Sequence, residues 1–128
     1  MKKEDIEIAN KIETEEDAQN FVNGKVPELE AQYGCKVIPM LFNLNDEWIY
    51  GWFKSPTRLQ IMSILGKAGV QPFFSGELLL QTNLLKESDV RIMNESPLYD
   101  ELYTGACLAA YAASNKIVYN LAEKKTGK

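Results

Sequence analysis

Few residues of this chain have the types and the spacing that catalysis requires. The sequence contains no histidine, so the commonest general base and the commonest metal ligand are both missing. Ser63 and Lys67 lie four residues apart and could place a hydroxyl beside an amine, but that spacing alone does not specify Ser–Lys catalysis. A solvated helix face is the better interpretation of this pair. We therefore predict that the protein is not an enzyme.

The sequence also lacks the spacing of a metal or cofactor site. Oxygen-bearing side chains gather at residues 43–47, but a calcium loop has a different spacing and a terminal acid, so a turn is the better interpretation. Gly66 and Lys67 end a helical pattern, whereas a phosphate-binding loop opens a helix. Cys35 and Cys107 are too far apart for a CxxC motif or a paired zinc site. We expect two reduced thiols, no metal and no cofactor.

The composition is that of one globular domain with an acidic end. The chain has 128 residues, of which 45% are hydrophobic and 25% are charged. Its formal net charge of −4 argues against nucleic acid or an anionic membrane as the partner. Residues 1–32 carry four lysines and nine acidic residues, so the excess negative charge lies there. No stretch resembles a signal peptide or a membrane-spanning helix, and we expect a cytoplasmic protein.

Hydrophobic periodicity divides the chain into four parts and predicts one α+β domain over residues 1–128. Residues 1–13 are expected to be frayed, and residues 14–34 to form an acidic helical segment. An extended pattern at residues 36–54 predicts a β-hairpin. Residues 55–122 return to helical spacing and should end in a long C-terminal helix that packs, with the other helices, against the hairpin.

The turn and the edge of the hairpin have specific signals. Asn45 and Asp46 both tolerate positive φ, which a tight primed turn requires. Pro39 has no backbone N–H, so its strand should lie at an edge and stay open to pairing.

Both faces of the second strand are apolar. Because side chains alternate along a strand, Trp48, Tyr50 and Trp52 share one face, while Ile49 and Phe53 take the other. An isolated hairpin is marginal in water, so both faces must be covered. Helices should cover one face. Another strand, the N-terminal segment or a partner subunit should cover the other.

The helical part begins twice with a Ser-Pro pair, at Ser55-Pro56 and at Ser96-Pro97, which predicts a capped helix start at each. The first of these helices carries an apolar stripe formed by Leu59, Ile61, Met62, Ile64 and Leu65. A helix over residues 73–85 is apolar almost all round and should lie in the core or at an interface.

Two later segments have distinct patterns. Residues 86–94 form a polar connector in which Val90 and Ile92 either add a strand or anchor a loop. In the C-terminal helix, the small residues from Gly105 to Ala113 allow another helix to approach closely.

The hairpin and the segment 73–85 hold more apolar surface than one small core obviously requires. We take the following as candidates for a protein interface: Phe42, Trp48, Tyr50, Trp52, Phe73, Phe74, Leu78 and Leu80. Stacking on a nucleic-acid base or a sugar is an alternative, but only Lys54 and Arg58 supply basic charge nearby. A homo-oligomer that buries the same residues is a further alternative, and it is compatible with a protein partner.

Four groups of residues, read in order, resemble a known family. They are residues 52–57 (WFKSPT), 76–80 (GELLL), Leu84 with 87–92, and 96–99 (SPLY) leading into the helix at 106–110. Over residues 36–122 this order resembles small proteins of tailed phages and prophages, of the tail assembly chaperone type.

The resemblance implies a non-enzymatic protein without a cofactor. Proteins of that type look like small cytoplasmic α-helical or α+β proteins that bind the aggregation-prone tape measure protein, keep it soluble and guide tail-tube polymerisation around it. The partner would then be a protein client, with no nucleic acid and no membrane. The alternative is a structural virion protein, such as a head, neck or cargo subunit, that stays in the finished particle.

Overall fold

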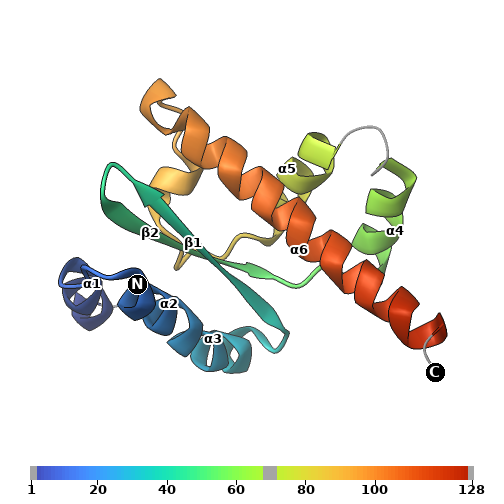
Figure 1. The fold of residues 1–128 in the computed structure, drawn as a ribbon, viewed down its shortest axis with the longest axis horizontal. Helices are drawn as coiled ribbons and strands as arrows, with labels where there is room; N and C mark the ends of the chain where they lie inside the picture. The colour runs from blue at the N-terminus through green and yellow to red at the C-terminus, as the bar shows by residue number, and fades with distance from the viewer. Residues whose placement is uncertain (1–2, 68–71, 127–128) are drawn as a thin grey trace.

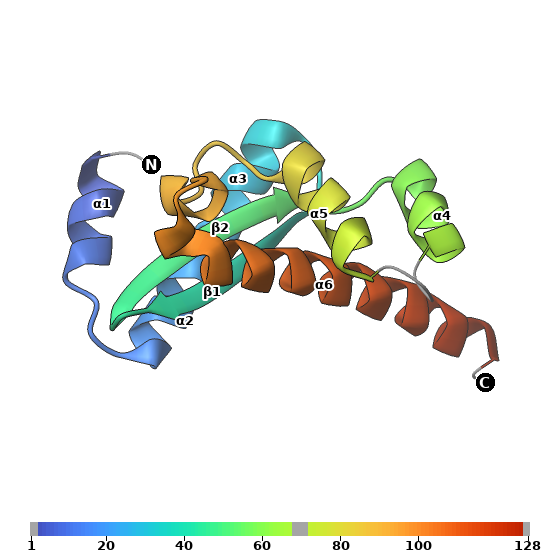
Figure 2. The same cartoon turned by 90° about the horizontal axis from the view of Figure 1, so that it is seen from above.

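The computed structural model describes the backbone of residues 3–67 and 72–126, and the side chains of residues 7–63 and 73–113. A two-stranded antiparallel hairpin lies between two layers of helices (Figure 1). Helices α2 (Glu15–Gly24) and α3 (Val26–Tyr33) cover one face, and helices α5 (Pro72–Asn83) and α6 (Asp100–Thr126) cover the other (Figure 2). The predicted α+β class with a long C-terminal helix is confirmed.

The remaining elements are shorter. They are helices α1 (Lys3–Asn10) and α4 (Arg58–Lys67), strands β1 (Val37–Leu44) and β2 (Glu47–Lys54), and the single 3₁₀ turns η1 (Val90–Met93) and η2 (Pro97–Tyr99).

The hairpin has the predicted turn. Asn45 and Asp46 have φ values of 52° and 66°, and they join the directly paired residues Leu44 and Glu47. Positive φ at both central residues is the signature of a type I′ turn, whose twist matches that of the flanking strands.

The two faces of the hairpin contribute to two separate apolar clusters. Tyr50 and Trp52 of β2 are buried against α2 and α3, while Ile49 and Phe53 are buried against α5 and α6. The predicted alternation of faces is therefore confirmed. Of the alternatives for the second face, the N-terminal segment is the one that covers it (Figures 1 and 2).

The N-terminal segment, where residues 1–13 were predicted to be frayed, contains a short helix. Residues 3–10 form α1, and Ala9 and Ile12 pack against the cluster beneath α2. The helical structure predicted for residues 14–34 is present as α2 and α3. The Thr14 hydroxyl caps α2 by accepting a hydrogen bond from the backbone N–H of Asp17 at 3.2 Å.

The outer edge of β2 is covered by the connector that follows α5. The backbone N–H groups of Leu85 and Asp89 donate to the carbonyls of Trp52 and Tyr50, at 2.8 and 2.9 Å. The Ser88 hydroxyl accepts from the N–H of Trp52 at 2.9 Å. Residues 86–94 therefore anchor a loop instead of adding a regular strand, one of the two alternatives left open by the sequence.

One helix begins two residues later than predicted. Thr57, not Ser55, caps α4: its hydroxyl accepts from the N–H of Gln60 at 3.2 Å, and the Gln60 side chain accepts from the N–H of Thr57 at 2.9 Å. This reciprocal capping box satisfies two N–H groups at once, whereas the N–H of Ser55 donates to the carbonyl of Lys36 at 2.9 Å and so extends the hairpin. The second Ser-Pro start is confirmed, since the Ser96 hydroxyl accepts from the N–H of Leu98.

Candidate protein-binding surface

The aromatic side chains on one face of β2 hold the helical layer of α2 and α3 on the hairpin. Trp52 is fully buried, and its indole N–H donates to the carbonyl of Val22 at 2.8 Å. The buried ring of Tyr50 meets the ring of Phe21 edge-on, with centroids 4.8 Å apart. Trp48 packs, half-buried, against the same cluster. Because the rings of Tyr50 and Trp52 are covered by protein, they do not form a stacking surface for a base or a sugar.

The predicted interface residues on α5 divide between the core and the surface. Leu80 is fully buried, and Phe73 is half-buried against the cluster that joins β2 to α6. Phe74 and Leu78 are 57% and 46% exposed. Because they lie four residues apart, they share one face of the helix. Phe42, the remaining predicted residue, lies half-buried on β1 beneath α6.

Helix α4 adds exposed apolar side chains that the sequence analysis did not select. Leu59 and Met62 are 78% and 61% exposed and lie three residues apart. Among the described side chains of α4, that of Gln60 contacts α5, since its amide exchanges hydrogen bonds of 2.8 and 2.9 Å with Asn83. Ile61 is half-buried, and the side chains of residues 64 and 65 lie outside the described part.

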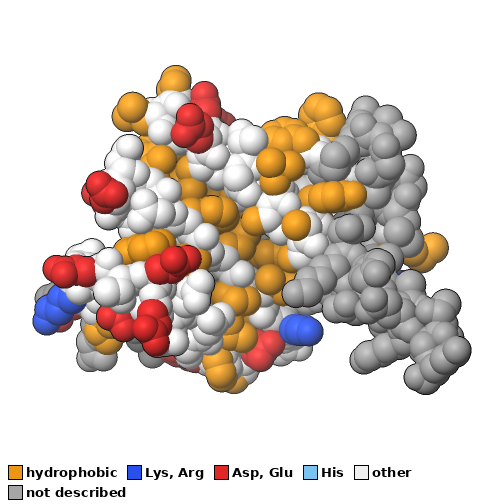
Figure 3. Space-filling model, viewed as in Figure 1, with side chains coloured by type: hydrophobic (Ala, Val, Ile, Leu, Met, Phe, Trp, Pro, Cys, Tyr) orange, Lys and Arg blue, Asp and Glu red, His pale blue; other side chains and the backbone are white. Residues whose placement is uncertain are grey.

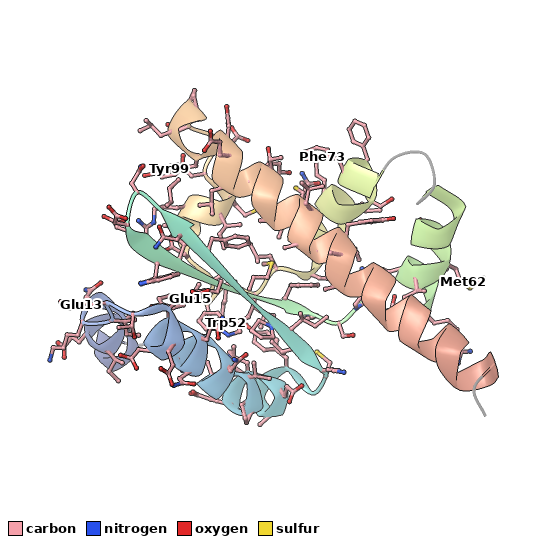
Figure 4. The ribbon with its side chains drawn as sticks, viewed as in Figure 1. Glu13, Glu15, Trp52, Met62, Phe73 and Tyr99 are labelled. Carbon is pink, nitrogen blue, oxygen red and sulfur yellow. The ribbon has the colours of Figure 1, made fainter. Side chains whose placement is uncertain are left out.

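The sequence signal for these residues was the apolar stripe of α4 itself. We name the exposed apolar residues of the two helices the α4–α5 surface: Leu59, Met62, Phe74 and Leu78. Figure 4 shows Met62 at the outer side of α4, away from the hairpin.

A polar cleft of about 310 Å³ lies where α1, β2 and η1 meet, and Trp48, Tyr50, Asp89 and Arg91 contribute to its lining. The Arg91 guanidinium contacts Asp89 at 2.7 Å and also pairs with Glu47. Burial raises the pKa of Asp89, but its hydrogen bonds with Arg91 outweigh that effect and hold the pKa below its ordinary value. Asp89 and Arg91 therefore keep their charges near neutral pH and serve as a structural pair, not as an acid or a base.

A second cleft, of about 360 Å³, is lined by the polar side chains of Glu77, Gln81, Asp100 and Tyr103. The Tyr103 hydroxyl donates to Glu77 at 2.5 Å and accepts from Gln81 at 3.1 Å, so these groups satisfy one another. Burial and the Glu77 carboxylate raise the pKa of the nearby Cys107 thiol to about 11, which makes it a poor nucleophile. Within the described residues, no three His, Cys, Asp or Glu side chains converge as metal ligands would.

No protein-family model, no curated protein and no solved structure matches this chain. In the described parts of the chain, no helix combines the length and the hydropathy needed to span a bilayer.

Proposed function

We propose that this protein is a non-enzymatic binding factor of phage tail assembly, which holds an aggregation-prone client of the tape measure type. The observation that carries the proposal is the exposure of large apolar side chains on α4 and α5. Leu59, Met62, Phe74 and Leu78 are each between 46% and 78% exposed. Large apolar side chains that gather at the surface of a small domain commonly mark a site of protein association.

The placement of these residues suits a client that is itself apolar and helical. Each helix presents its two exposed side chains at a spacing of three or four residues, the spacing at which helices pack against one another. The client class comes from the resemblance to tail assembly chaperones, whose clients are long proteins that aggregate when alone. An exposed apolar surface is what such a client requires.

The distribution of charge is compatible with this role. The exposed acidic side chains at the start of α2 lie in the layer on the other face of the hairpin from α5 and α6 (Figure 1). Net negative charge keeps a protein soluble while it exposes apolar surface elsewhere.

Co-expression with a tape measure protein from the same phage or prophage tests the proposal. The soluble fraction of the tape measure protein should rise when the full chain is present. The double variant Phe74→Ser/Leu78→Ser should lose most of that increase. Leu98→Ser is the matched control, because Leu98 is 77% exposed but lies on η2 and belongs to neither α4 nor α5. It should behave as the wild type does.

An unchanged soluble fraction, or equal activity of the double variant with its fold intact by circular dichroism, would count against the proposal. Mass spectrometry of purified particles then separates the two assembly roles. A binding factor is absent from the finished particle, whereas a structural head, neck or cargo subunit is present in fixed copy number.

A further inference from the structure

Strand β1 has an outer edge whose backbone groups are partly unpaired. The Ser55 N–H donates to the carbonyl of Lys36, and Leu44 is paired with Glu47. This register directs the N–H and C=O groups of the even-numbered residues of β1 toward β2, and those of the odd-numbered residues toward the outer edge. In the described structure the sheet has two strands, so no strand pairs with that edge.

Only part of this edge is blocked. The N–H of Val37 donates to the Glu30 carboxylate at 3.1 Å, and Pro39 has no N–H. Within the described residues, the N–H groups of Leu41 and Asn43 have no partner. Asn43 is exposed and Leu41 is half-buried, so this half of the edge is open to another backbone.

The two helical layers lie on either side of this edge. On the α6 side Gly105 lies close to β1, since a Cβ there would lie 4.0 Å from the ring of Phe42. On the other side lies α2, where Glu15 precedes the buried residues Ala18 and Val22 by three and seven positions and therefore lies on the same side of the helix. Figure 4 shows Glu15 on the side of α2 toward the hairpin. In Figure 3, apolar side chains cross the middle of this face, and acidic side chains flank them.

We propose that the open edge of β1 binds an extended segment of a partner protein, in which basic residues alternate with apolar ones. The unpaired groups at Leu41 and Asn43 require a backbone in the extended conformation. Side chains of an added strand alternate between the two layers, so apolar ones would meet α6 and basic ones would meet the carboxylates of α2. The partner segment is thus recognised by its extended backbone and by its basic side chains.

A second copy of this chain fits the edge less well. Two β1 edges paired antiparallel about a two-fold axis place the same helical layers side by side, so the acidic start of one α2 would approach that of its partner. Repulsion between these two sets of carboxylates would oppose the association of two copies. The proposal concerns β1 and α2, and stands independently of the α4–α5 surface.

The probe is an acetylated and amidated peptide of about nine residues that alternates lysine and valine, with a glutamate–valine peptide as its control. Amide hydrogen exchange of the full chain, measured residue by residue by NMR, provides the readout. The lysine peptide, at about ten times its Kd, should slow exchange at Leu41 and Asn43 by about tenfold. The glutamate peptide should leave these two amides unchanged.

Two pairs of variants test the backbone and the charge separately. Asn43→Pro removes an outward N–H and no hydrogen bond to β2, and it should weaken lysine-peptide binding about fivefold, while Asn43→Ala retains the wild-type affinity. Glu15→Gln should weaken binding about twofold, and more than Glu16→Gln, because the side chain of Glu16, in the same first turn, points about 100° away from that of Glu15 around α2.

Three results would overturn the proposal. The first is equal protection by the lysine and glutamate peptides. The second is protection of Leu41 and Asn43 that rises with protein concentration in the absence of peptide, because the occupant would then be a second copy. The third is wild-type binding by both Asn43→Pro and Glu15→Gln. If Asn43→Pro fails to fold, the Glu15 and Glu16 variants and the two peptides still decide the outcome.

Discussion

Gly76 of α5 lies directly against the backbone carbonyl of Cys107 in α6. A Cβ atom at residue 76 would lie 1.9 Å from that oxygen and 3.1 Å from the Cβ of Tyr111. Atoms cannot approach to such distances, so the crossing of the two helices depends on the missing side chain. The neighbouring small residues Ala106 and Ala110 are fully buried, which completes a close contact between the helices.

The substitution Gly76→Ala should therefore destabilise the protein, even though alanine has the higher intrinsic helix propensity. We expect a loss of about 3 kcal/mol in the free energy of unfolding, because α5 and α6 must separate to admit the methyl group. Urea unfolding followed by circular dichroism measures it. Gly24→Ala is the control, since a Cβ there meets nothing within 4 Å and its φ is not positive. That variant should be neutral or more stable by up to about 1 kcal/mol, and an equal loss in both variants would contradict this explanation.

The hydrogen bond from the Trp52 indole to the carbonyl of Val22 should contribute to the attachment of α2. Trp52→Phe keeps an aromatic ring but leaves a buried carbonyl without its donor and a small cavity beside it. We expect a loss of about 2 to 3 kcal/mol, measured by urea unfolding. Trp48→Phe serves for comparison, because Trp48 is only half-buried, and its cost should be smaller. Equal costs would show that the indole hydrogen bond contributes little.

Replacement of the turn residue Asp46 by glycine should stabilise the protein. Its φ of 66° is a conformation that glycine adopts without a steric penalty, and Asn-Gly is the preferred pair for this type of turn. Asp46→Gly should stabilise the protein by about 0.5 to 1 kcal/mol, whereas Asp46→Ala should destabilise it by about 1 kcal/mol. The thermal unfolding midpoints of the wild type, Asp46→Gly and Asp46→Ala, measured at one pH, give the order of their stabilities directly. A less stable glycine variant would contradict the expected turn energetics.

The Tyr33–Glu87 contact should make stability depend on alkaline pH. The Tyr33 hydroxyl donates to Glu87 at 2.6 Å, and this hydrogen bond, with burial and the carboxylate charge, raises the pKa of Tyr33 from 10.0 to about 12. A raised folded-state pKa contributes stability that is fully present below pH 10 and is lost as the pH rises from about 10 to about 12. Urea midpoints over this pH window should fall more steeply for the wild type than for Tyr33→Phe.

The variant Glu87→Gln provides the complementary measurement. Without the carboxylate, the pKa of Tyr33 should move back toward its ordinary value, and the Tyr33 part of the absorbance change near 295 nm, obtained by subtracting the curve of the same protein with Tyr33→Phe, should occur at lower pH than in the wild type. Burial raises the pKa of Glu87 itself, but the hydrogen bond from Tyr33 helps to hold the net value below the ordinary one. The stability due to Glu87 should therefore be present above its unfolded-state pKa and be lost as the pH falls through the lowered value.

Local chemistry explains the parts of the fold that could be predicted. Asn45 and Asp46 set the turn because few other residues tolerate two consecutive positive φ values. The alternation of Trp48, Tyr50 and Trp52 with Ile49 and Phe53 follows from the period of a strand, which does not depend on what covers each face. Ser96 was predicted as a cap because a hydroxyl at a helix start satisfies a backbone N–H that lies only two residues away.

Local chemistry could not predict which apolar side chains remain exposed to solvent. Leu59 and Met62 have the same types and spacing as core residues, yet α4 contacts α5 through Gln60 and leaves them in solvent. Leu80 and Trp52 resembled interface residues and are buried. Whether an apolar side chain is covered depends on how helices from distant parts of the chain pack, and spacing within one helix carries no information about that.

By itself, the sequence determined the class of elements, the hairpin turn, the two apolar faces of β2 and the scarcity of catalytic groups, because each depends on a few neighbouring residues. The tertiary structure alone decided that the N-terminal helices cover the second face, that residues 84–89 occupy the edge of β2, and that Gly76 meets Cys107. It also left part of the β1 edge open between the α2 and α6 layers. Those outcomes depend on contacts between residues far apart in the chain, whose geometry is set only when all the layers pack together.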